Sequence, residues 1–310
     1  MDEDLYIEYN EKTGEPFLRL GENILKLDRE EISGEFAEKA FKELRETPEN
    51  RERGLDELRN WLKNEENFFK PNEDTAFLLK FLRPCKFYAK SAFKIMKKFY
   101  KFKEKNLKYS QNLIPESVER CYIDEIITFL PARTLEGSRI MVVNIANWNP
   151  KEVSVTTFIR GVFIALEIAM GEPKTQVGGV HVILNLEGLS LSHITQFNPS
   201  LARMILQLVQ ECLPLRLKGI HIINQLTLFK VIYAIFKPFI GEKLKKRLFF
   251  HGTNYDELLA KVDSFCLPPR WGGTLSSPDA PGRLLYDIIH FYSYEYKEIS
   301  TYGYTKKIET

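Results

Sequence analysis

Cysteine is scarce in this sequence of 310 residues. The four cysteines, Cys85, Cys121, Cys212 and Cys266, lie far apart and form no CxxC pair. Such spacing excludes the common zinc-binding motifs and a framework of disulfides, and it is typical of a protein from a reducing compartment. The acidic start, Met1 to Asp4, is unlike a secretory or transit signal. We therefore expect a cytoplasmic protein without a structural metal.

Long apolar runs and an imbalance of charge are also missing. No uninterrupted apolar stretch reaches the roughly 20 residues that a membrane-spanning helix needs, so any contact with a membrane is expected to be peripheral. Lys and Arg total 44 against 42 Asp and Glu, which gives a net charge of +2. So small an excess indicates no particular partner, and only local clusters of charge are informative. The length suggests about two domains, with a core large enough to need no disulfide.

Common enzyme motifs do not occur either. The sequence has no GxSxG, HExxH or Walker A motif, and no GxGxxG after a strand. His181 and His221 lie on predicted buried strands, where a hydrogen-bonded structural histidine is commoner than a catalytic one. Glu167 lies within an apolar helix and needs a partner there, either a structural ion pair or a hydroxyl group of a ligand. We therefore predict no enzyme, no catalytic residue, no cofactor and no metal site.

The first part of the sequence has a helical pattern. Apolar residues recur at helical spacing from about residue 33 to 67, with Pro48 at the start of a second helix. A short helix over 75–82 with Asn72 as its N-cap and a long amphipathic helix over 88–109 follow. The polar face of the long helix is rich in lysine, as ordinary solvated faces often are, and no RNA-binding motif accompanies it. We therefore predict no nucleic-acid partner.

From about residue 126 the pattern changes to strands that alternate with helices. Strands at 126–130 and 139–145 precede a helix over 153–170. Buried, β-branched runs at 177–187 and 220–224 then enclose a helix over 199–212, which makes a βαβ unit. We therefore predict an α/β protein with a mixed, largely parallel sheet flanked by helices. The expected division is an N-terminal arm at 1–29, a helical domain at 30–115, an α/β domain at 116–275 and a C-terminal tail at 276–310.

The stretch from Gln225 to Phe239 is the most informative part of the sequence. Apart from Lys230 and Lys237 it is almost entirely apolar, and a basic cluster at 243–247 follows it. A helix that is apolar nearly all round is either buried on every side or faces apolar material other than protein. The basic cluster favours lipid beside an anionic surface. An ordinary core helix with a solvated basic end is the alternative.

Several short motifs together resemble a known family. The N-terminal motif lies within residues 72–106 and includes Phe77-Leu78-Leu79-Lys80-Phe81-Leu82-Arg83. The later motifs are Asn185-Leu186-Glu187-Gly188, Pro214-Leu215-Arg216, Gly219-Ile220-His221-Ile222-Ile223-Asn224, Phe236-Lys237-Pro238-Phe239, His251-Gly252 and Trp271-Gly272-Gly273. In order and spacing they resemble the CRAL-TRIO lipid-transfer family over roughly residues 30–275. The resemblance is closest to the branch of the α-tocopherol transfer protein and the cellular retinaldehyde-binding protein.

The resemblance implies a CRAL-TRIO lipid-binding domain with a mobile lid helix. It implies a protein that binds and transfers a small hydrophobic lipid, such as a retinoid, tocopherol, carotenoid or sterol, and releases it at phosphoinositide-containing membranes. We expect a monomer that is peripheral at those membranes. The alternatives are transfer of phospholipid or phosphatidylinositol, and an interaction module that regulates membrane traffic or a small GTPase. The residues expected to line the pocket form a floor of strand residues, walls of helix residues and a lid. The floor is Val180, Val182, Leu184, Ile220 and Ile222, the walls are Ile159, Val162, Phe163, Leu166, Ile205, Leu208 and Val209, and the lid is Leu228, Phe229, Ile232 and Ile235.

Four basic residues match the positions that grip a phosphoinositide headgroup in the same branch of the family. They are Arg216, Lys218, Lys243 and Arg247. We expect Lys243 and Arg247 to stand at i, i+4 on one helical face, and both pairs to converge on one polyanion.

Three leucines depart from the family's pattern. Leu226 stands where proline is usual, so the entry to the lid is expected to bend differently. Leu215 and Leu244 replace polar residues of the phosphatidylinositol-exchanging members. The loss of these polar headgroup contacts favours a small isoprenoid-like ligand over a phospholipid.

Overall fold

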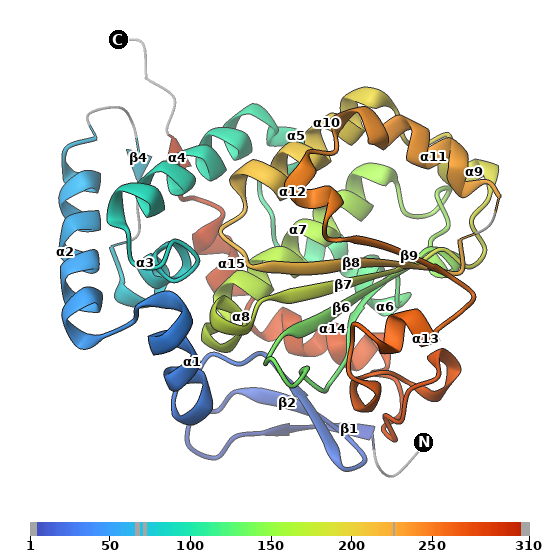
Figure 1. Cartoon of the computed structure of the whole chain (residues 1–310), viewed down its shortest axis with the longest axis horizontal. Helices are drawn as coiled ribbons and strands as arrows, with labels where there is room; N and C mark the ends of the chain where they lie inside the picture. Colours follow the sequence, from blue (N-terminus) through green and yellow to red (C-terminus); the bar gives the residue numbers. More distant parts are fainter. Residues whose placement is uncertain (1–4, 66–68, 71–72, 226, 305–310) are drawn as a thin grey trace.

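A mixed sheet of five strands forms the centre of the fold (Figure 1). The computed structural model describes residues 5–65, 69–70, 73–225 and 227–304. The strands, in their order across the sheet, are β5 (Ile127–Phe129), β6 (Arg139–Asn144), β7 (Val180–Asn185), β8 (Leu217–Ile223) and β9 (Leu248–Gly252). β5 is antiparallel to β6 and the other neighbours are parallel, which confirms the predicted mixed, largely parallel sheet. The sequence analysis did not predict β9.

The alternation of side chains along the strands gives the sheet two different faces. Val182 and Ile222 belong to the large core on one face, whereas Ile183 and Ile223 pack in a smaller cluster on the other. Trp271 belongs to the smaller cluster. The short elements near this second face are α13 (Asp256–Leu259), η5 (Ser264–Cys266) and η6 (Pro269–Trp271).

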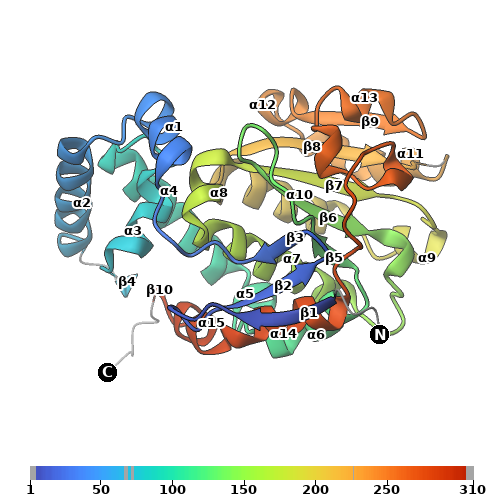
Figure 2. The same ribbon diagram turned by 90° about the horizontal axis from the view of Figure 1, so that it is seen from below.

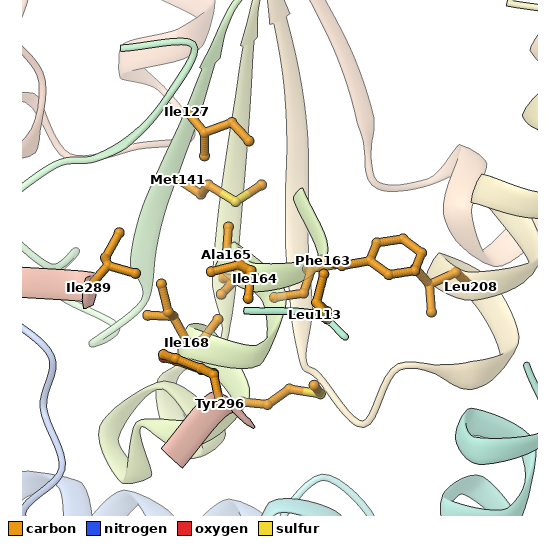
Figure 3. Close-up of a cluster of buried hydrophobic side chains, with 14 of the residues drawn as sticks. Leu113, Ile127, Met141, Phe163, Ile164, Ala165, Ile168, Leu208, Ile289 and Tyr296 are labelled. Atoms are coloured by element: carbon orange, nitrogen blue, oxygen red, sulfur yellow. The ribbon is translucent and has the colours of Figure 1, made fainter. Parts of the chain in front are cut away.

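Two predicted helices cover the first face of the sheet. They are α7 (Val155–Gly171) and α10 (Pro199–Gln207), and η3 (Leu208–Cys212) continues α10 as a π-helix. Ser154 caps α7 by accepting a hydrogen bond from Thr157 N, and Asn198 caps α10 in the same way through Leu201 N. In Figure 3, Ile164 and Ile168 of α7 lie near the sheet residue Met141, with Tyr296 of a C-terminal helix close by.

One predicted strand begins later than expected. Residues 177–178 end the helix α8 (Pro173–Gly178), and β7 starts at Val180. Gly179 makes the turn with a positive φ of 88°, and a Cβ there would lie 2.4 Å from the carbonyl oxygen of Arg216. Only glycine fits so close to the neighbouring strand.

The N-terminal helices share the large core with the α/β part. Their bounds are α1 (Gly34–Leu44), α2 (Pro48–Lys63), α3 (Thr75–Leu82), α4 (Ala89–Lys105), α5 (Leu107–Ser110), η1 (Pro115–Val118) and α6 (Glu119–Ile123). The N-cap of α3 is Asp74, whereas the predicted Asn72 lies outside the described residues. Phe102 of α4 stacks near Phe163 of α7, with 6.2 Å between ring centroids. The two parts are therefore packed together, and the division at residue 115 stays a prediction.

The two ends of the described chain complete the structure. The N-terminal arm forms a three-stranded antiparallel sheet of β1 (Leu5–Tyr9), β2 (Pro16–Leu20) and β3 (Asn23–Lys26). This sheet packs against α14 (Gly282–Phe291), as Figure 2 shows. The C-terminal region continues with α15 (Ser293–Ile299) and with β10 (Gly303–Tyr304), which pairs with β4 (Phe69–Lys70). The other short elements are η2 (Ile145–Asn147), α9 (Leu191–Ile194), α11 (Phe229–Phe236), η4 (Lys237–Phe239) and α12 (Glu242–Lys245).

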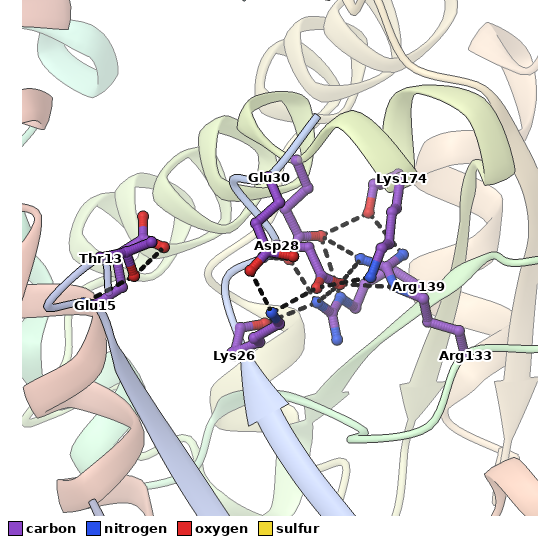
Figure 4. Close-up of polar contacts among 10 residues, drawn as sticks. Thr13, Glu15, Lys26, Asp28, Glu30, Arg133, Arg139 and Lys174 are labelled. Atoms are coloured by element: carbon purple, nitrogen blue, oxygen red, sulfur yellow. Dashed lines mark hydrogen bonds and ion pairs between the residues drawn. The ribbon is translucent and has the colours of Figure 1, made fainter. Parts of the chain in front are cut away.

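A buried ion network fastens the arm to the sheet and to α7 (Figure 4). Glu172, just after α7, bonds to Arg139 at the start of β6 and, at 3.1 Å, to Arg133. Arg133 also pairs with Asp28 of the arm at 2.7 Å, and the backbone N–H of Asp28 donates to Glu172 at 3.0 Å. Burial alone would raise the pKa of Glu172, but the two guanidinium groups outweigh it and lower the pKa to about 2.

Replacing Glu172 should therefore destabilise the fold strongly. Glu172→Gln leaves two buried guanidinium groups without their central anion, and we expect the free energy of unfolding at neutral pH to fall by about 3–5 kcal/mol. Because the pKa of Glu172 is lowered from 4.5 to about 2 in the fold, its contribution is complete above about pH 4.5 and is lost as the pH falls toward 2. Urea denaturation at several pH values measures both effects.

The exposed Glu22 in the same arm supplies the matched control. Glu22→Gln should leave the urea midpoint nearly unchanged. Equal midpoints for Glu172→Gln and the parent protein would show that the network does not hold the arm.

Candidate functional site

The predicted lid is a short apolar helix, α11, whose side chains are incompletely covered. It spans Phe229–Phe236 and is followed by η4 (Lys237–Phe239), within the predicted stretch 225–239. Of its eight residues, all of them described, none is buried. Val231 is 50% exposed, whereas Phe229, Ile232 and Ile235 are half-buried. Leu228, just before the helix, is also half-buried, and Leu226 lies outside the described residues.

Aromatic contacts and one glutamine hold the lid in place. The ring of Phe250 on β9 lies 5.6 Å from that of Phe229 and 5.3 Å from that of Tyr233. At the other end of the lid, the amide of Gln210 donates to the carbonyl oxygen of Phe239 at 3.0 Å and accepts from Gly241 N at 2.7 Å. Gln210 belongs to the π-helix η3, a distortion that frequently marks functional sites. The sequence analysis missed Gln210 and Phe250, which have no motif of their own.

The predicted floor residues all lie on one face of the sheet. Val180, Val182 and Ile222 are buried there, whereas Leu184 and Ile220 are only half-buried. All five contribute to the large core, whose neighbours include Leu228 and Phe229 at the lid. Because β8 has a hydrogen-bonded strand on both sides, the remaining exposure of Ile220 lies on a face of the sheet and not at its edge. The apolar face is therefore incompletely sealed near the lid.

The predicted wall residues divide into two groups. Val162, Ile205 and Val209 are half-buried, and Ile159 is buried. Phe163, Leu166 and Leu208 instead meet Phe99 and Phe102 of α4 around a small cavity of about 10 Å³. A cavity of that size holds at most one water molecule. The second group therefore faces the N-terminal helices, and its contact with a ligand stays a prediction.

Glu167 also faces that core and has a structural partner. Its carboxylate lies 3.8 Å from Lys103 Nζ, and both side chains are buried. Burial lowers the pKa of Lys103. The sequence analysis considered an ion pair or a hydroxyl group of a ligand as the partner of Glu167, and the structure shows an ion pair.

The four predicted headgroup residues lie at the start of β8 and in the segment that leads into β9. Arg216 and Lys218 lie at the start of β8, Lys243 lies in α12, and Arg247 comes just before β9. Ile220 N donates to the carbonyl oxygen of Arg247 at 2.7 Å, which sets Arg247 beside the start of β8. The expected i, i+4 helical pair is wrong, because α12 ends at Lys245 and the backbone of Arg247 already bonds to the sheet.

Two of these basic residues are neutralised by acidic partners. Arg216 bonds to Glu43 of α1 at 2.6 Å and to the carbonyl oxygen of Val177. Lys218 Nζ lies 3.9 Å from Glu136, and Lys39 bridges Glu43 and Glu136 at 2.8 and 2.5 Å. Hydrogen bonds from Lys39 and Arg216 outweigh partial burial and lower the pKa of Glu43 to about 2, so it is ionised at neutral pH. By contrast, Lys243 and Arg247 form no ion pair within the described part of the chain.

Three histidines form a hydrogen-bonded chain across the other face of the sheet. His181 Nδ1 lies 2.9 Å from His221 Nε2, and His221 Nδ1 lies 3.0 Å from His251 Nε2. Burial lowers the pKa of His181 to about 4 and that of His221 to about 3, so both are neutral at pH 7. Hydrogen bonds between neutral imidazoles fit the structural role expected for His181 and His221, and the sequence analysis did not identify His251 as their partner. Across the described ranges, no group of three His, Cys, Asp or Glu side chains is placed to hold a metal ion.

None of the helices in the described ranges is both long and apolar enough to cross a bilayer.

Comparison of the sequence with known proteins shows its family. The family model of the CRAL/TRIO domain matches residues 123–273. The protein "Alpha-tocopherol transfer protein-like" of Mus musculus is 31% identical over 248 residues, which cover 80% of this chain and 72% of that protein. Clavesin-1 of Pongo abelii is 29% identical over 250 residues, covering 80% of this chain and 71% of the relative. The crystal structure of Sfh5 shares 10% identity over 81% of this chain and 91% of its own, with a TM-score of 0.46. The chain belongs to the CRAL/TRIO family.

Proposed function

We propose that this protein binds a small hydrophobic lipid between α11 and the sheet and transfers it to membranes. The observation that carries the proposal is an apolar helix without a buried residue, set near a half-buried apolar sheet face. A retinoid, tocopherol, carotenoid or sterol would cover both surfaces at once. Each 100 Å² of apolar surface removed from water contributes about 2.5 kcal/mol. The relative named for α-tocopherol transfer supports the same class of ligand.

The structure supports a carrier more readily than an enzyme. Glu167 and Lys103, which lie beside the predicted wall residues Phe163, Leu166 and Leu208, are paired with each other. The three histidines lie on the face of the sheet opposite Val182 and Ile222. We therefore propose a monomeric, cytoplasmic carrier that associates peripherally with membranes and needs no cofactor.

Opening of the lid would couple release of the lipid to a membrane. Moving α11 outward exposes more of Phe229 and Ile232, which costs free energy in water but much less at a bilayer. Opening must break the contacts of Gln210 and Phe250 and the contact of Phe236 with Phe197, whose ring centroids lie 5.8 Å apart. A membrane that holds the basic residues beside the lid would therefore favour the open state.

Headgroup binding would take place in two stages. Lys243 and Arg247 are unpaired within the described residues and are available for first contact with a phosphoinositide. Arg216 and Lys218 would then have to leave Glu43 and Glu136. Glu43 and Glu136 thus compete with the headgroup for Arg216 and Lys218. A membrane must therefore carry enough negative charge to displace them before the second stage of binding can occur.

Phospholipid transfer is the second candidate to be distinguished. Leu244 is only 5% exposed in α12, so it offers no polar contact to a phospholipid headgroup. Native mass spectrometry followed by organic extraction of the purified protein identifies the ligand directly. An isoprenoid or sterol in the extract supports the proposal, and a bound phospholipid favours the second candidate. A protein that never carries lipid favours an interaction module.

A charge on the inner side of the lid should prevent closure over a lipid. We expect Phe229→Asp to reduce the bound lipid at least tenfold, because an ionised carboxylate resists burial against an apolar ligand. The fold should survive, since Phe229 is only half-buried. Val231→Asp on the exposed side of the same helix is the control and should retain its lipid. Equal lipid content in both variants would contradict the assignment of the lid.

Removal of the two unpaired cations should weaken membrane binding selectively. Each basic residue near an anionic surface contributes about 1 kcal/mol, so we expect Lys243→Glu/Arg247→Glu to lose at least roughly thirtyfold in partitioning to phosphoinositide vesicles. Transfer of lipid to those vesicles should slow, while affinity for lipid in solution stays the same. Sedimentation with neutral, phosphatidylserine and phosphoinositide vesicles makes the comparison. Equal losses on both anionic vesicles would indicate a surface without headgroup preference.

Removal of an acidic competitor should have the opposite effect. Glu43→Gln frees Arg216 from its ion pair, and we expect about fivefold tighter binding to phosphoinositide vesicles, equivalent to about 1 kcal/mol. Glu35→Gln, an exposed site on the same helix, changes the net charge equally and is the control. If both variants bind alike, total charge and not the pairing of Arg216 governs membrane binding.

A further inference from the structure

A second cavity, of about 450 Å³, lies where the N-terminal arm meets α3, α8 and α15. In Figures 1 and 2, α3, α8 and α15 lie toward one end of the strands of the central sheet, and α11 lies toward the other end. None of the predicted lipid-pocket or headgroup residues lines it. Its volume is within the range of sites for small organic molecules.

The cavity contains a buried lysine that forms no ion pair within the described ranges. Lys80 of α3 is 8% exposed, and no hydrogen bond or ion pair joins it to another described residue. The carboxylates of Glu167 and Glu295 attract it only from beyond ion-pair distance. Its Nζ lies 5.3 Å from the centroid of the Phe77 ring. Lysine is almost never buried unless it is paired, because its ammonium loses solvation that nothing replaces. Burial accordingly lowers the pKa of Lys80.

A second donor in the cavity is also unsatisfied. Arg29 of the arm bonds to Glu295 at 2.9 Å and to the hydroxyl of Tyr296 at 3.3 Å, but its Nε is buried and has no partner among the described residues. Gly171 makes room for this guanidinium, since a Cβ there would lie 2.6 Å from Nη1. The position of Arg29 thus depends on the absence of a side chain at the end of α7.

The other charges of the cavity leave these donors available. Arg83 is already bonded to Glu46, at 2.9 Å, and to Gln176, at 2.8 Å. The carboxylates that line the cavity are exposed or half-buried, whereas Lys80 and Arg83 are buried. The exposed ones are Glu31, Asp74 and Glu298, and the half-buried ones are Glu15 and Glu295, the latter bonded to Arg29. The cavity therefore has cationic donors at depth and carboxylates toward solvent, which orients a ligand with its anionic group inward.

We propose that this cavity is a second binding site, for a small organic anion. A carboxylate or phosphate would accept hydrogen bonds from Lys80 Nζ and Arg29 Nε, and an apolar or aromatic body would pack against Phe77 and Ile299. Such charge-assisted bonds satisfy both donors and replace the solvation that Lys80 lacks. The site is independent of the lipid pocket, so either can exist without the other.

Four probes test the chemistry of this site by isothermal titration calorimetry on the full chain. They are phenyl phosphate, benzoate, inorganic phosphate and the neutral benzyl alcohol. We expect saturable binding of phenyl phosphate or benzoate that is at least tenfold tighter than that of benzyl alcohol. If phenyl phosphate alone binds, the natural ligand carries a phosphate, and if benzoate alone binds, it carries a carboxylate. Absence of saturable binding by both aromatic anions overturns the proposal.

Substitutions locate the binding. Lys80→Met should lower the affinity for the aromatic anion about ten- to hundredfold, since a buried charged hydrogen bond is lost. Lys94→Met, at an exposed site on α4, should not change it. Ala76→Trp narrows the cavity from its exposed edge without touching a charge, and it too should weaken binding. Phe229→Asp should bind the anion like the parent, which separates this site from the lid.

Thermal stability distinguishes a ligand site from a structural lysine. If Lys80 awaits a ligand, Lys80→Met removes an uncompensated buried charge, so the melting temperature without ligand stays equal or rises. The anion then no longer stabilises the variant. A lower melting temperature together with unchanged anion affinity shows a structural role and overturns the proposal.

Discussion

The buried network of Asp28, Arg133, Arg139 and Glu172 is the constraint on which the positions of the other parts depend. Two guanidinium groups and two carboxylates lie in the interior, and each is stable there because the others compensate its lost hydration. The network joins the arm, the first long strand and the end of α7. Because α7 lies on the sheet, fixing its end also fixes the face of the sheet that the lid approaches. Arg29 follows Asp28 directly and lines the second cavity, so the same ion network also fixes the position of Arg29.

The local parts of this structure were predictable from the sequence. Val180, Val182 and Leu184 share a face of the sheet because side chains alternate along a strand. That period of two residues can be recognised in the amino-acid sequence alone. The apolar helix α11 was recognisable for a related reason. Its residues lack a polar stripe, and no pattern of an ordinary surface helix explains that composition. Caps such as Ser154 and Asn198 likewise act within three residues, so their effect on helix starts is readable without a fold.

The parts that were not predictable depend on pairing between distant segments. Glu43 and Arg216 are 173 residues apart, and the sequence around each residue gives no indication that they form an ion pair. The error at Arg247 has the same origin. A lysine-rich stretch suggests a continuing helix, but the backbone of Arg247 is taken by a hydrogen bond from β8, which ends the helix at Lys245. His251 was missed because its partner His221 lies on a strand whose neighbour, β9, was itself not predicted.

Whether a basic side chain has an acidic partner is more informative about function than its presence in the sequence. The information is greater when the side chain is buried, because an unpaired buried charge is costly. Lys243 is exposed, so its lack of a partner costs almost nothing in water and would be unremarkable without the neighbouring lid. Arg216 is paired, so an incoming anion gains only the difference between its own interaction free energy with Arg216 and that of Glu43. Lys80 is buried without an ion pair, so the cost of its desolvation is offset only by carboxylates at a greater distance, Glu167 and Glu295. An anion that reaches Lys80 recovers that cost, and this makes Lys80 the strongest local indication of a missing ligand among the three.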